Sequence, residues 1–327
     1  MNIAVDAMGG DNAPEVVVHG AARACEDLNC NIILVGDSKA ISSCLKDGYS
    51  ETGMGIQHCS EVIGMDESPM KAFRNKKDSS IRVAFDLMKT GKADAVVSAG
   101  NSGATMAAGM LLSGKLDTVE RPALACMLPG VNGDVILIDV GGNVDCRPIH
   151  LLQFGMMAEA FAVSCLKMNN PKIGILNIGE EPGKGNEQVK AAYDLFSGSS
   201  LNFAGNVEGR DILTGDVQII VCDGFTGNIV LKFSEGMAES FSSRLFNGLK
   251  EKHLDIQDQE FLNEFKESLD YAEYGGAPIL GINGVGVVCH GHSSSRAIKN
   301  AIKTAYNYVE NDTGEKLLRR LRDYRQN

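Results

Sequence analysis

Long hydrophobic runs are missing from this sequence. No uninterrupted apolar stretch approaches the roughly 20 residues that a membrane-spanning helix needs, so we do not expect an integral membrane protein. At the N-terminus no basic stretch precedes an apolar run, and Asp6, Asp11 and Glu15 interrupt the first segment. We therefore expect no targeting signal and a cytoplasmic location.

Positive charge is also scarce. The 31 lysines and arginines are outnumbered by 42 aspartates and glutamates, which gives a formal net charge of −11 and a sequence pI near 5.1. An acidic chain repels the phosphate backbone of nucleic acids, so we expect no nucleic-acid partner.

Paired cysteines and the common nucleotide-binding fingerprints are absent as well. The nine cysteines include no CxxC pair and mostly lie in apolar runs such as ALACML and VGVVCH, which indicates reduced core thiols. The segment GMLLSGKL (109–116) has Leu116 where a P-loop needs a hydroxyl, and AMGGDNA lacks the spacing of GxGxxG. We expect no cofactor.

Short apolar runs alternate with segments of helical period along most of the chain. This alternation predicts an α/β fold with a mainly parallel sheet that helices cover on both faces. We expect one domain over residues 1–327 with a helical insertion at about 230–275. The expected strands are NIAVD, NIILVG, DAVVSA, ALACML, DVILIDV, KIGILNI, DVQIIVC and VGVVCH. The expected helices cover residues 14–25, 80–90, 102–112, 151–167, 185–196, 235–251, 260–271 and 294–309.

Six of the expected strands end in small polar turns. In open α/β sheets, ligands bind beyond the carboxyl ends of the strands, where loops expose N–H groups. We expect the six turns to share one edge of the sheet and to hold an anion through neutral donors and one lysine. Each turn taken alone is equally compatible with a simple glycine or asparagine turn. The polar residues of these turns are Ser98, Asn101, Ser102, Asn143, Lys184, Asn186, Asn228, His290 and Ser293.

Other polar residues near the strand ends have simpler interpretations. His290 and His292 form an HxH pair, which is compatible with zinc binding, with a role of His290 in the site, or with loop packing. No third ligand follows at a suitable spacing, so we expect no metal. Three carboxylates are expected mainly to cap helices or to pin loops: Asp6, Asp139 and Asp223. Neither Cys222 nor Cys289 has a motif for an activating partner, so a covalent acyl-cysteine is disfavoured.

The insertion contains two repeating apolar patterns. Apolar residues recur every four positions on either side of a polar linker, which predicts two amphipathic helices. Such helices either pack against each other or a second copy of the chain, or attach to a membrane surface. The apolar residues are Phe241, Leu245, Leu249, Phe261, Phe265 and Leu269.

Long motifs give this sequence a close resemblance to one family, the acyl-carrier-protein:phosphate acyltransferases of bacterial phospholipid synthesis, also called fatty acid/phospholipid synthesis proteins. The resemblance extends from Met1 to about Val309. It departs from the family pattern at Ser102, where threonine is usual, at Gly142, where alanine is usual, and in the HGHS of residues 290–293. The motifs are DAMGGDNAP, EVIGMDESPMKAFRNKKDSSIRVAFDLMKTGKADAVVSAGNSGA, RPAL, NIGEEPGKGNE, FAGNVEGRDI, DVQIIVCDGFTGNIVLK and GAPILGINGVGVVCHGHSSSRAIKNAI.

The resemblance implies an α/β/α sandwich similar to phosphotransacetylases and to isocitrate or isopropylmalate dehydrogenases. It implies a homodimer that associates peripherally with membranes and converts acyl carrier protein thioester and inorganic phosphate into acyl phosphate. The product would go to a membrane glycerol-3-phosphate acyltransferase. A basic run is then a candidate docking surface for the acidic carrier protein, or else a solvated face: Lys71, Arg74, Lys76, Lys77 and Arg82.

This reaction needs a phosphate cradle, donors for the thioester oxygen and a proton for the departing thiolate. We expect Lys184, Asn228 and His290 to be catalytic, with His290 as the acid, and Asn228 and Asn143 as oxyanion or pantetheine-amide donors. The other expected substrate-binding residues are Gly9, Gly10, Asp11, Ser98, Asn101, Ser102, Gly103, Asn186, Asp223, Thr226, Gly227 and Ser293. Two alternatives remain: a nicotinamide-dependent dehydrogenase of related fold and a noncatalytic, membrane-recruited scaffold.

Overall fold

A computed structural model describes residues 1–45, 53–251 and 275–326. These residues form an 11-stranded sheet in the order β3-β2-β1-β4-β11-β10-β5-β6-β9-β7-β8. The strands are β1 (Asn2–Asp6), β2 (Asn31–Gly36), β3 (Met54–His58), β4 (Ala95–Ser98), β5 (Ala123–Leu128), β6 (Val135–Ile138), β7 (Ile173–Asn177), β8 (Phe203–Glu208), β9 (Ile219–Val221), β10 (Ala277–Leu280) and β11 (Val285–Val288).

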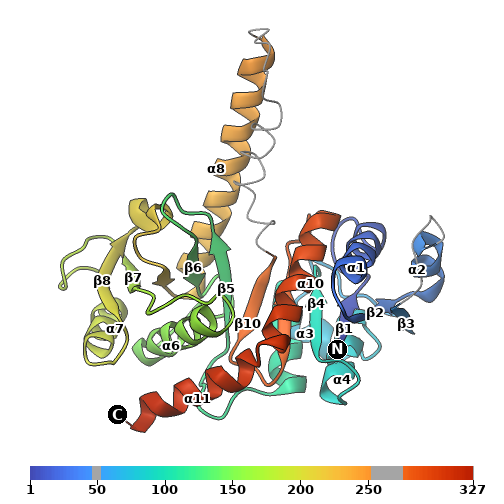
Figure 1. The fold of residues 1–327 in the computed structure, drawn as a ribbon, viewed down its shortest axis with the longest axis horizontal. Coiled ribbons are helices and arrows are strands. Elements are labelled where there is room, and N and C mark those ends of the chain that lie inside the picture. The colour runs from blue at the N-terminus through green and yellow to red at the C-terminus, as the bar shows by residue number, and fades with distance from the viewer. Residues whose placement is uncertain (46–52, 252–274, 327) are drawn as a thin grey trace.

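The described helices surround this sheet (Figure 1). They are α1 (Glu15–Asp27), α2 (Ser38–Leu45), α3 (Pro69–Asn75), α4 (Ser80–Lys89), α5 (Ser102–Ala108), the π-helix η1 (Gly109–Ser113), α6 (Pro148–Ser164), α7 (Glu187–Ser197), the 3₁₀ helix η2 (Gly209–Thr214), α8 (Gly224–Glu251), α10 (Ser295–Glu310) and α11 (Thr313–Gln326).

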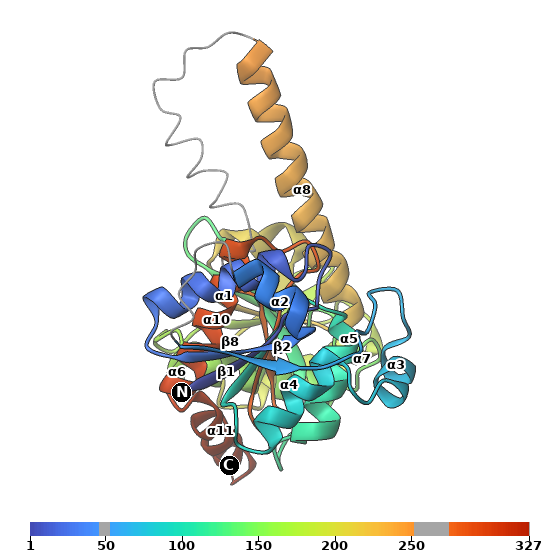
Figure 2. The same cartoon turned by 90° about the vertical axis from the view of Figure 1, so that its right-hand side faces the viewer.

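Helices cover both faces of the sheet, which confirms the expected three layers. Along β1, Ile3 and Val5 belong to one buried cluster and Ala4 to the other, because successive strand side chains point to opposite faces. The first cluster includes residues of α1, α6, α7, α10 and α11, and the second includes residues of α3, α4 and α5. Figure 2 shows α1 and α10 on one side of the strands and α4 on the other.

The sheet is mainly parallel but reverses direction in its middle. Three neighbouring pairs are antiparallel, namely β11 with β10, β10 with β5, and β5 with β6. Three reversals make β6, β9 and β7 run opposite to β1, β4 and β11. The expectation that six polar turns share one edge is therefore wrong. They form two groups of three, one from each half of the sheet.

All eight expected strands are present, but β3, β8 and β10 escaped prediction. One of these is β10, whose four residues lie among glycines with positive φ, Gly275, Gly276 and Gly281, and so resemble a loop in sequence. The helix expected over residues 260–271 lies outside the described residues. That residues 1–327 act as one domain stays a prediction.

Helix α8 differs most from its expected form. It begins at Gly224, directly after β9, and not near residue 235. The reason is a cap by Asp223, one of the carboxylates expected to cap a helix or to pin a loop: its Oδ1 accepts a hydrogen bond from the Thr226 N–H at 2.8 Å. The polar turn that was expected to contain Asn228 is thus the beginning of a 28-residue helix, about 42 Å long at 1.5 Å per residue. Figure 1 shows α8 projecting far beyond the sheet.

No helix in the described parts of the chain is long and apolar enough to cross a membrane.

Candidate active site

The two halves of the sheet meet at a cavity of about 370 Å³, here called the central cavity. Strand β10 makes this possible because it pairs with β11 at Ala277 and with β5 at Leu280, which links the two halves. One wall comes from Asn101, Ser102, Val288 and His290, at or beyond the ends of β4 and β11. The opposite wall comes from Leu124, Val140, Gly141 and α8.

One face of α8 supplies the polar lining of the second wall. Asn228, Lys232 and Glu235 lie four and three residues apart, a spacing that places them on one side of a helix. Gly227 lets the helix approach the end of β6, since a Cβ at this position would lie 1.9 Å from the Asp139 carbonyl oxygen. A glycine at this point therefore sets how closely the three polar side chains approach the cavity.

Lys232, Glu235 and His290 form the charged centre of the cavity, here called the Lys232 cluster. The Lys232 Nζ lies 2.9 Å from Glu235 Oε2 and 2.6 Å from His290 Nε2. Burial, followed by the charge of Lys232, lowers the pKa of His290 below its usual value, while Glu235 acts in the opposite direction. This shift favours the neutral form of the His290 ring.

Glu235 also has an unused acceptor. Its side chain is only 14% exposed, and its Oε1 atom has no hydrogen-bond partner within the described part of the chain. A buried carboxylate oxygen without a donor is costly unless a ligand or water supplies one. The cluster thus offers both an ammonium donor and an acceptor to a ligand.

The second histidine of the HxH pair has separate partners. His292 Nδ1 lies 2.7 Å from Asp11 Oδ2, and the His292 N–H donates to His290 Nδ1 at 3.2 Å. Among the described residues, no group of three or more histidine, cysteine, aspartate or glutamate side chains is arranged to hold a metal ion. The pair connects the turn after β1 to the turn after β11.

Several predicted substrate-binding residues have structural partners of their own. Asn101 donates from Nδ2 to the carbonyls of Gly64, Met65 and Glu67 at 3.1–3.3 Å, and its Oδ1 caps α5. Ser98 is 1% exposed and donates to Asp6 Oδ2 at 2.7 Å. These side chains hold the walls in position, and their hydrogen-bonding groups are already engaged.

The same applies on the other half of the sheet. Asn143 donates from Nδ2 to Pro122 O and to Asp139 Oδ2, both at 2.8 Å, while Asn186 caps α7 through Val189 N–H at 2.9 Å. The Asp139 carboxylate also accepts from the N–H groups of Leu124, Gly142 and Asn143. Burial raises the pKa of Asp139, although these donors oppose the shift. The expectation that the strand-end carboxylates pin loops or cap helices is confirmed.

The structure brings only part of the predicted site together. Lys184 is exposed in the turn after β7, where its carbonyl accepts from Asn177 Nδ2 at 3.1 Å. It does not occur among the described residues that line the central cavity. The predicted residues that do line the cavity are Asn101, Ser102, Gly103, Asn228, His290 and Ser293. Those outside its lining are Gly9, Gly10, Asp11, Ser98, Asn143, Lys184, Asn186, Asp223, Thr226 and Gly227.

Sequence reasoning missed Lys232 and Glu235. Lys232 follows Asn228 within the stretch that was interpreted as a polar turn, and Glu235 stands at the expected start of a helix. The helical spacing of the two residues from Asn228 therefore carried no meaning. The signal was the Asp223-x-x-Thr226 cap, which starts the helix early enough to align Asn228 with Lys232.

Two cysteines line the central cavity without being reactive. Burial raises the pKa of both Cys126 and Cys289 to about 12, so both remain thiols at neutral pH. The pKa of buried Cys222 is raised well above its usual value for the same reason. A covalent acyl-cysteine gains no support, since the thiolate is the nucleophilic form.

A second cavity of about 470 Å³, here called the apolar groove, lies beside the base of α8. Leu231 and Glu235 line both cavities, so the two are neighbours along one helix. Of the predicted insertion residues, Phe241 and Leu245 line the groove. Leu249 lies on α8, and Phe261, Phe265 and Leu269 lie outside the described residues.

Only part of the basic run is free of intramolecular roles. Lys76 pairs with Glu67 and donates to Val62 O at 2.7 Å, and Arg82 stacks over Phe73 at 5.0 Å. The remaining basic side chains of the run are exposed: Lys71, Arg74 and Lys77. The segment that precedes them reaches the central cavity, because Met65, whose carbonyl accepts from Asn101 Nδ2, contributes to the lining.

A family model described as "Fatty acid synthesis protein" matches residues 1–316. The chain belongs to this family. A phosphate acyltransferase of Geotalea daltonii is 48% identical over 329 residues, covering 99% of this chain and 95% of the relative. A phosphate acyltransferase of Citrifermentans bemidjiense is 50% identical over 315 residues, covering 94% and 89%. The chain is an acyltransferase.

Solved structures share the fold of this family member at much lower identity. A phosphotransacetylase from Streptococcus pyogenes superposes with a TM-score of 0.63 at 18% identity, covering 95% of this chain and 94% of its own. The EutD phosphotransacetylase from Staphylococcus aureus gives a TM-score of 0.62 at 15% identity, covering 94% of each. The expected likeness to phosphotransacetylases is therefore confirmed at the level of the fold.

Proposed function

We propose that this acyltransferase moves a long-chain fatty acyl group from an acyl carrier protein thioester to inorganic phosphate, giving acyl phosphate for phospholipid synthesis. The observation that carries the proposal is the Lys232 cluster, in which one ammonium and an unpaired carboxylate oxygen face a cavity. Monohydrogen phosphate has matching groups, since it carries negative oxygens for Lys232 and one P–OH for Glu235.

The reaction runs as a direct displacement. A phosphate oxygen attacks the thioester carbon, the new C–O bond forms, and the C–S bond breaks with its electrons on sulfur. Lys232 neutralises the charge of the attacking phosphate, and the exposed Asn228 amide donates to the carbonyl oxygen as that oxygen becomes negative. The His290 ring gives its N–H proton to the departing thiolate as Nε2 takes a proton from the Lys232 ammonium, 2.6 Å away, so the ring stays neutral and Lys232 is the net proton donor.

Lys184 remains in the proposal as a second cation for phosphate. It belongs to the GKGN turn, whose glycine-flanked N–H groups suit an anion. A Lys184→Ala variant should raise the KM for phosphate and lower turnover. If both stay within about twofold, a change below ~0.4 kcal/mol, Lys184 has no part in the reaction.

The partners follow from the same proposal. The exposed side chains of Lys71, Arg74 and Lys77 attract an acidic carrier protein, and α8 mediates either a homodimer or peripheral contact with the membrane. Acyl phosphate would pass to a membrane glycerol-3-phosphate acyltransferase. A cytoplasmic, peripherally membrane-associated enzyme fits this position.

Trapping the product tests the function directly. Purified protein is mixed with palmitoyl carrier protein and phosphate, and acyl phosphate is captured with hydroxylamine as the hydroxamate. Because hydroxylamine also attacks the thioester itself, the signal is the excess over this background, and hydroxamate should form faster than the background only when protein and phosphate are both present. A thioester that stays intact, or that decays equally without phosphate, would refute the proposal.

A further inference from the structure

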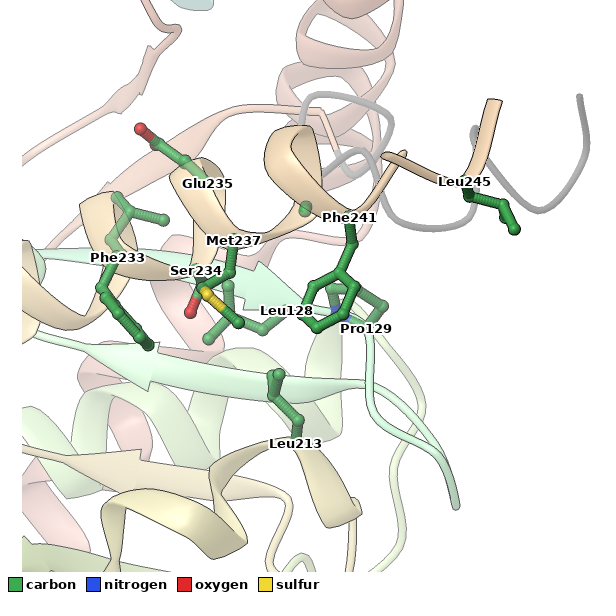
Figure 3. Close-up of a pocket in the computed structure, with 11 residues that line it drawn as sticks. Leu128, Pro129, Leu213, Phe233, Ser234, Glu235, Met237, Phe241 and Leu245 are labelled. Carbon is green, nitrogen blue, oxygen red and sulfur yellow. The ribbon is translucent and has the colours of Figure 1, made fainter. Parts of the chain in front are cut away.

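The apolar groove is a concave surface built from three elements. Its lining on α8 includes Phe233, Met237 and Phe241, which recur every four residues along one side of the helix. Leu128, at the end of β5, and Leu213, in η2, face them from below. Figure 3 shows the side chains of Phe233, Met237 and Phe241 turned toward Leu128, Pro129 and Leu213.

Two phenylalanine side chains of the groove are largely exposed to solvent. Phe233 is 67% exposed and Phe241 is 62% exposed, although both are held over a preformed floor. An exposed apolar hollow of this kind is typical of a site that is covered by a ligand or a partner. We therefore expect an apolar ligand or partner to occupy the groove.

The groove continues from the central cavity. Leu231 lines both, and so does Glu235, whose carboxylate points away from the groove's apolar side chains in Figure 3 and binds Lys232 Nζ at 2.9 Å. From Leu231 to Leu245 the helix rises by about 21 Å at 1.5 Å per residue. A linear molecule with its polar end at the Lys232 cluster thus has an apolar path of about this length for its tail.

We propose that the apolar groove is the binding site for the acyl chain of the thioester substrate. This inference rests on the proposed function, because that reaction places a long hydrocarbon tail next to the Lys232 cluster. Each methylene that enters the groove should raise kcat/KM about fourfold until the groove is filled. The groove, and not the polar cavity, then determines the preferred chain length.

Ala238 provides the variant that tests this assignment. It lines the groove midway along α8, so Ala238→Trp should obstruct the path. Glu235 lies one turn before Ala238, so the reaction of a short-chain substrate reports any effect on the Lys232 cluster. The matched control is Ile229→Trp, since Ile229 lies on the same helix, is 53% exposed, and is absent from the described lining of both cavities.

Hydroxamate assays are run with butyryl and palmitoyl carrier protein at saturating phosphate. Ala238→Trp should lower kcat/KM at least tenfold for the palmitoyl substrate and less than twofold for the butyryl substrate. Ile229→Trp should leave both within twofold. Equal losses for both chain lengths, or no loss for either, would overturn the groove as the acyl site.

A fluorescent 18-carbon fatty acid, cis-parinaric acid, measures the affinity of the groove for a hydrocarbon chain in the absence of turnover. Wild type and Ile229→Trp should bind it, and Ala238→Trp should bind at least tenfold more weakly. If wild type makes no acyl phosphate from either thioester, the proposed function fails, and this binding difference still decides the groove. Analytical ultracentrifugation tests whether a second copy of the chain occupies the groove instead. If Ala238→Trp dissociates a dimer but leaves the ratio of kcat/KM for the palmitoyl and butyryl substrates unchanged, the groove is a contact between two copies and not the acyl site.

Discussion

The central cavity and the apolar groove are built on the same helix, yet they offer opposite chemistry. Asn228, Lys232 and Glu235 fall within about 60° of one another around α8 at 100° per residue, whereas Phe233 and Met237 point to the other side. Both sets lie on the first four turns of the helix. The comparison teaches that the start of α8 determines which residues meet the polar cavity and which meet the groove.

Replacing Lys232, which lines the central cavity, should change the activity more than any other substitution predicted here. Lys232→Met removes the cluster's positive charge, so kcat/KM should fall at least 100-fold, about 2.7 kcal/mol, as measured by hydroxamate formation. Lys190→Met is the control, because Lys190 is a partly exposed lysine paired with Glu187 on α7. A larger loss in Lys184→Ala than in Lys232→Met would break the comparison and move the phosphate site to the turn after β7.

The placement of α8 itself is tested by two glycines of the helix. Gly227→Ala should destabilise the protein by about 1–3 kcal/mol, because its Cβ would lie 1.9 Å from Asp139 O. Gly236→Ala should instead stabilise it by about 0.5–1 kcal/mol, since nothing lies within 4 Å and alanine favours a helix. Urea unfolding of both variants measures the difference. The same sign for both would mean that the helix does not approach β6 this closely.

A smaller effect is expected where the carrier protein would dock. Lys71→Glu combined with Lys77→Glu should raise the KM for palmitoyl carrier protein about three- to tenfold at low salt, and the effect should shrink as salt rises. The KM for palmitoyl-CoA should stay unchanged. Lys172→Glu combined with Lys190→Glu controls for net charge, because it changes the charge by the same amount at lysines outside the basic run. Equal changes for both substrates would remove the docking surface and leave the comparison between the two cavities intact.

The pH dependence of His290 should show the smallest change, but with a defined sign. Lys232 lowers the pKa of His290 and Glu235 raises it, while His292 and Asp11 act more weakly. Lys232→Met should therefore move the His290 titration to higher pH, and Glu235→Gln should move it to lower pH. The imidazole resonances, followed by NMR between pH 5 and about 8, measure both shifts. Shifts in the same direction would contradict the arrangement of the cluster.

Much of the fold could be predicted because its signals are local. Ile3, Ala4 and Val5 alternate between two faces, and the apolar runs with helical segments between them indicate layered α/β structure. The direction of each strand could not be predicted in the same way. It depends on which strands become neighbours: β10, a four-residue strand among glycines, is antiparallel to both β11 and β5, and the antiparallel pairing of β5 with β6 then leaves the two halves running in opposite directions.

The candidate site was predicted less completely than the fold. Asn228 and His290 were identified and meet at the central cavity, whereas Lys232 and Glu235 were missed because the helix was expected to begin only at residue 235. Ser98, Asn101 and Asn143 have the residue types of a binding site, yet each makes hydrogen bonds that hold the loops. Residue type alone does not show whether a side chain donates its hydrogen bond to a ligand or to a neighbouring loop.

The amino-acid sequence by itself determined the layered α/β fold and the family, because apolar periodicity and long motifs are properties of neighbouring residues. Only the tertiary structure decided that Lys232, from α8, meets His290, from the turn after β11, and that Asn101 is already engaged. These contacts join residues far apart in the chain. They depend on how β10 connects the two halves of the sheet and on how closely Gly227 lets α8 approach β6.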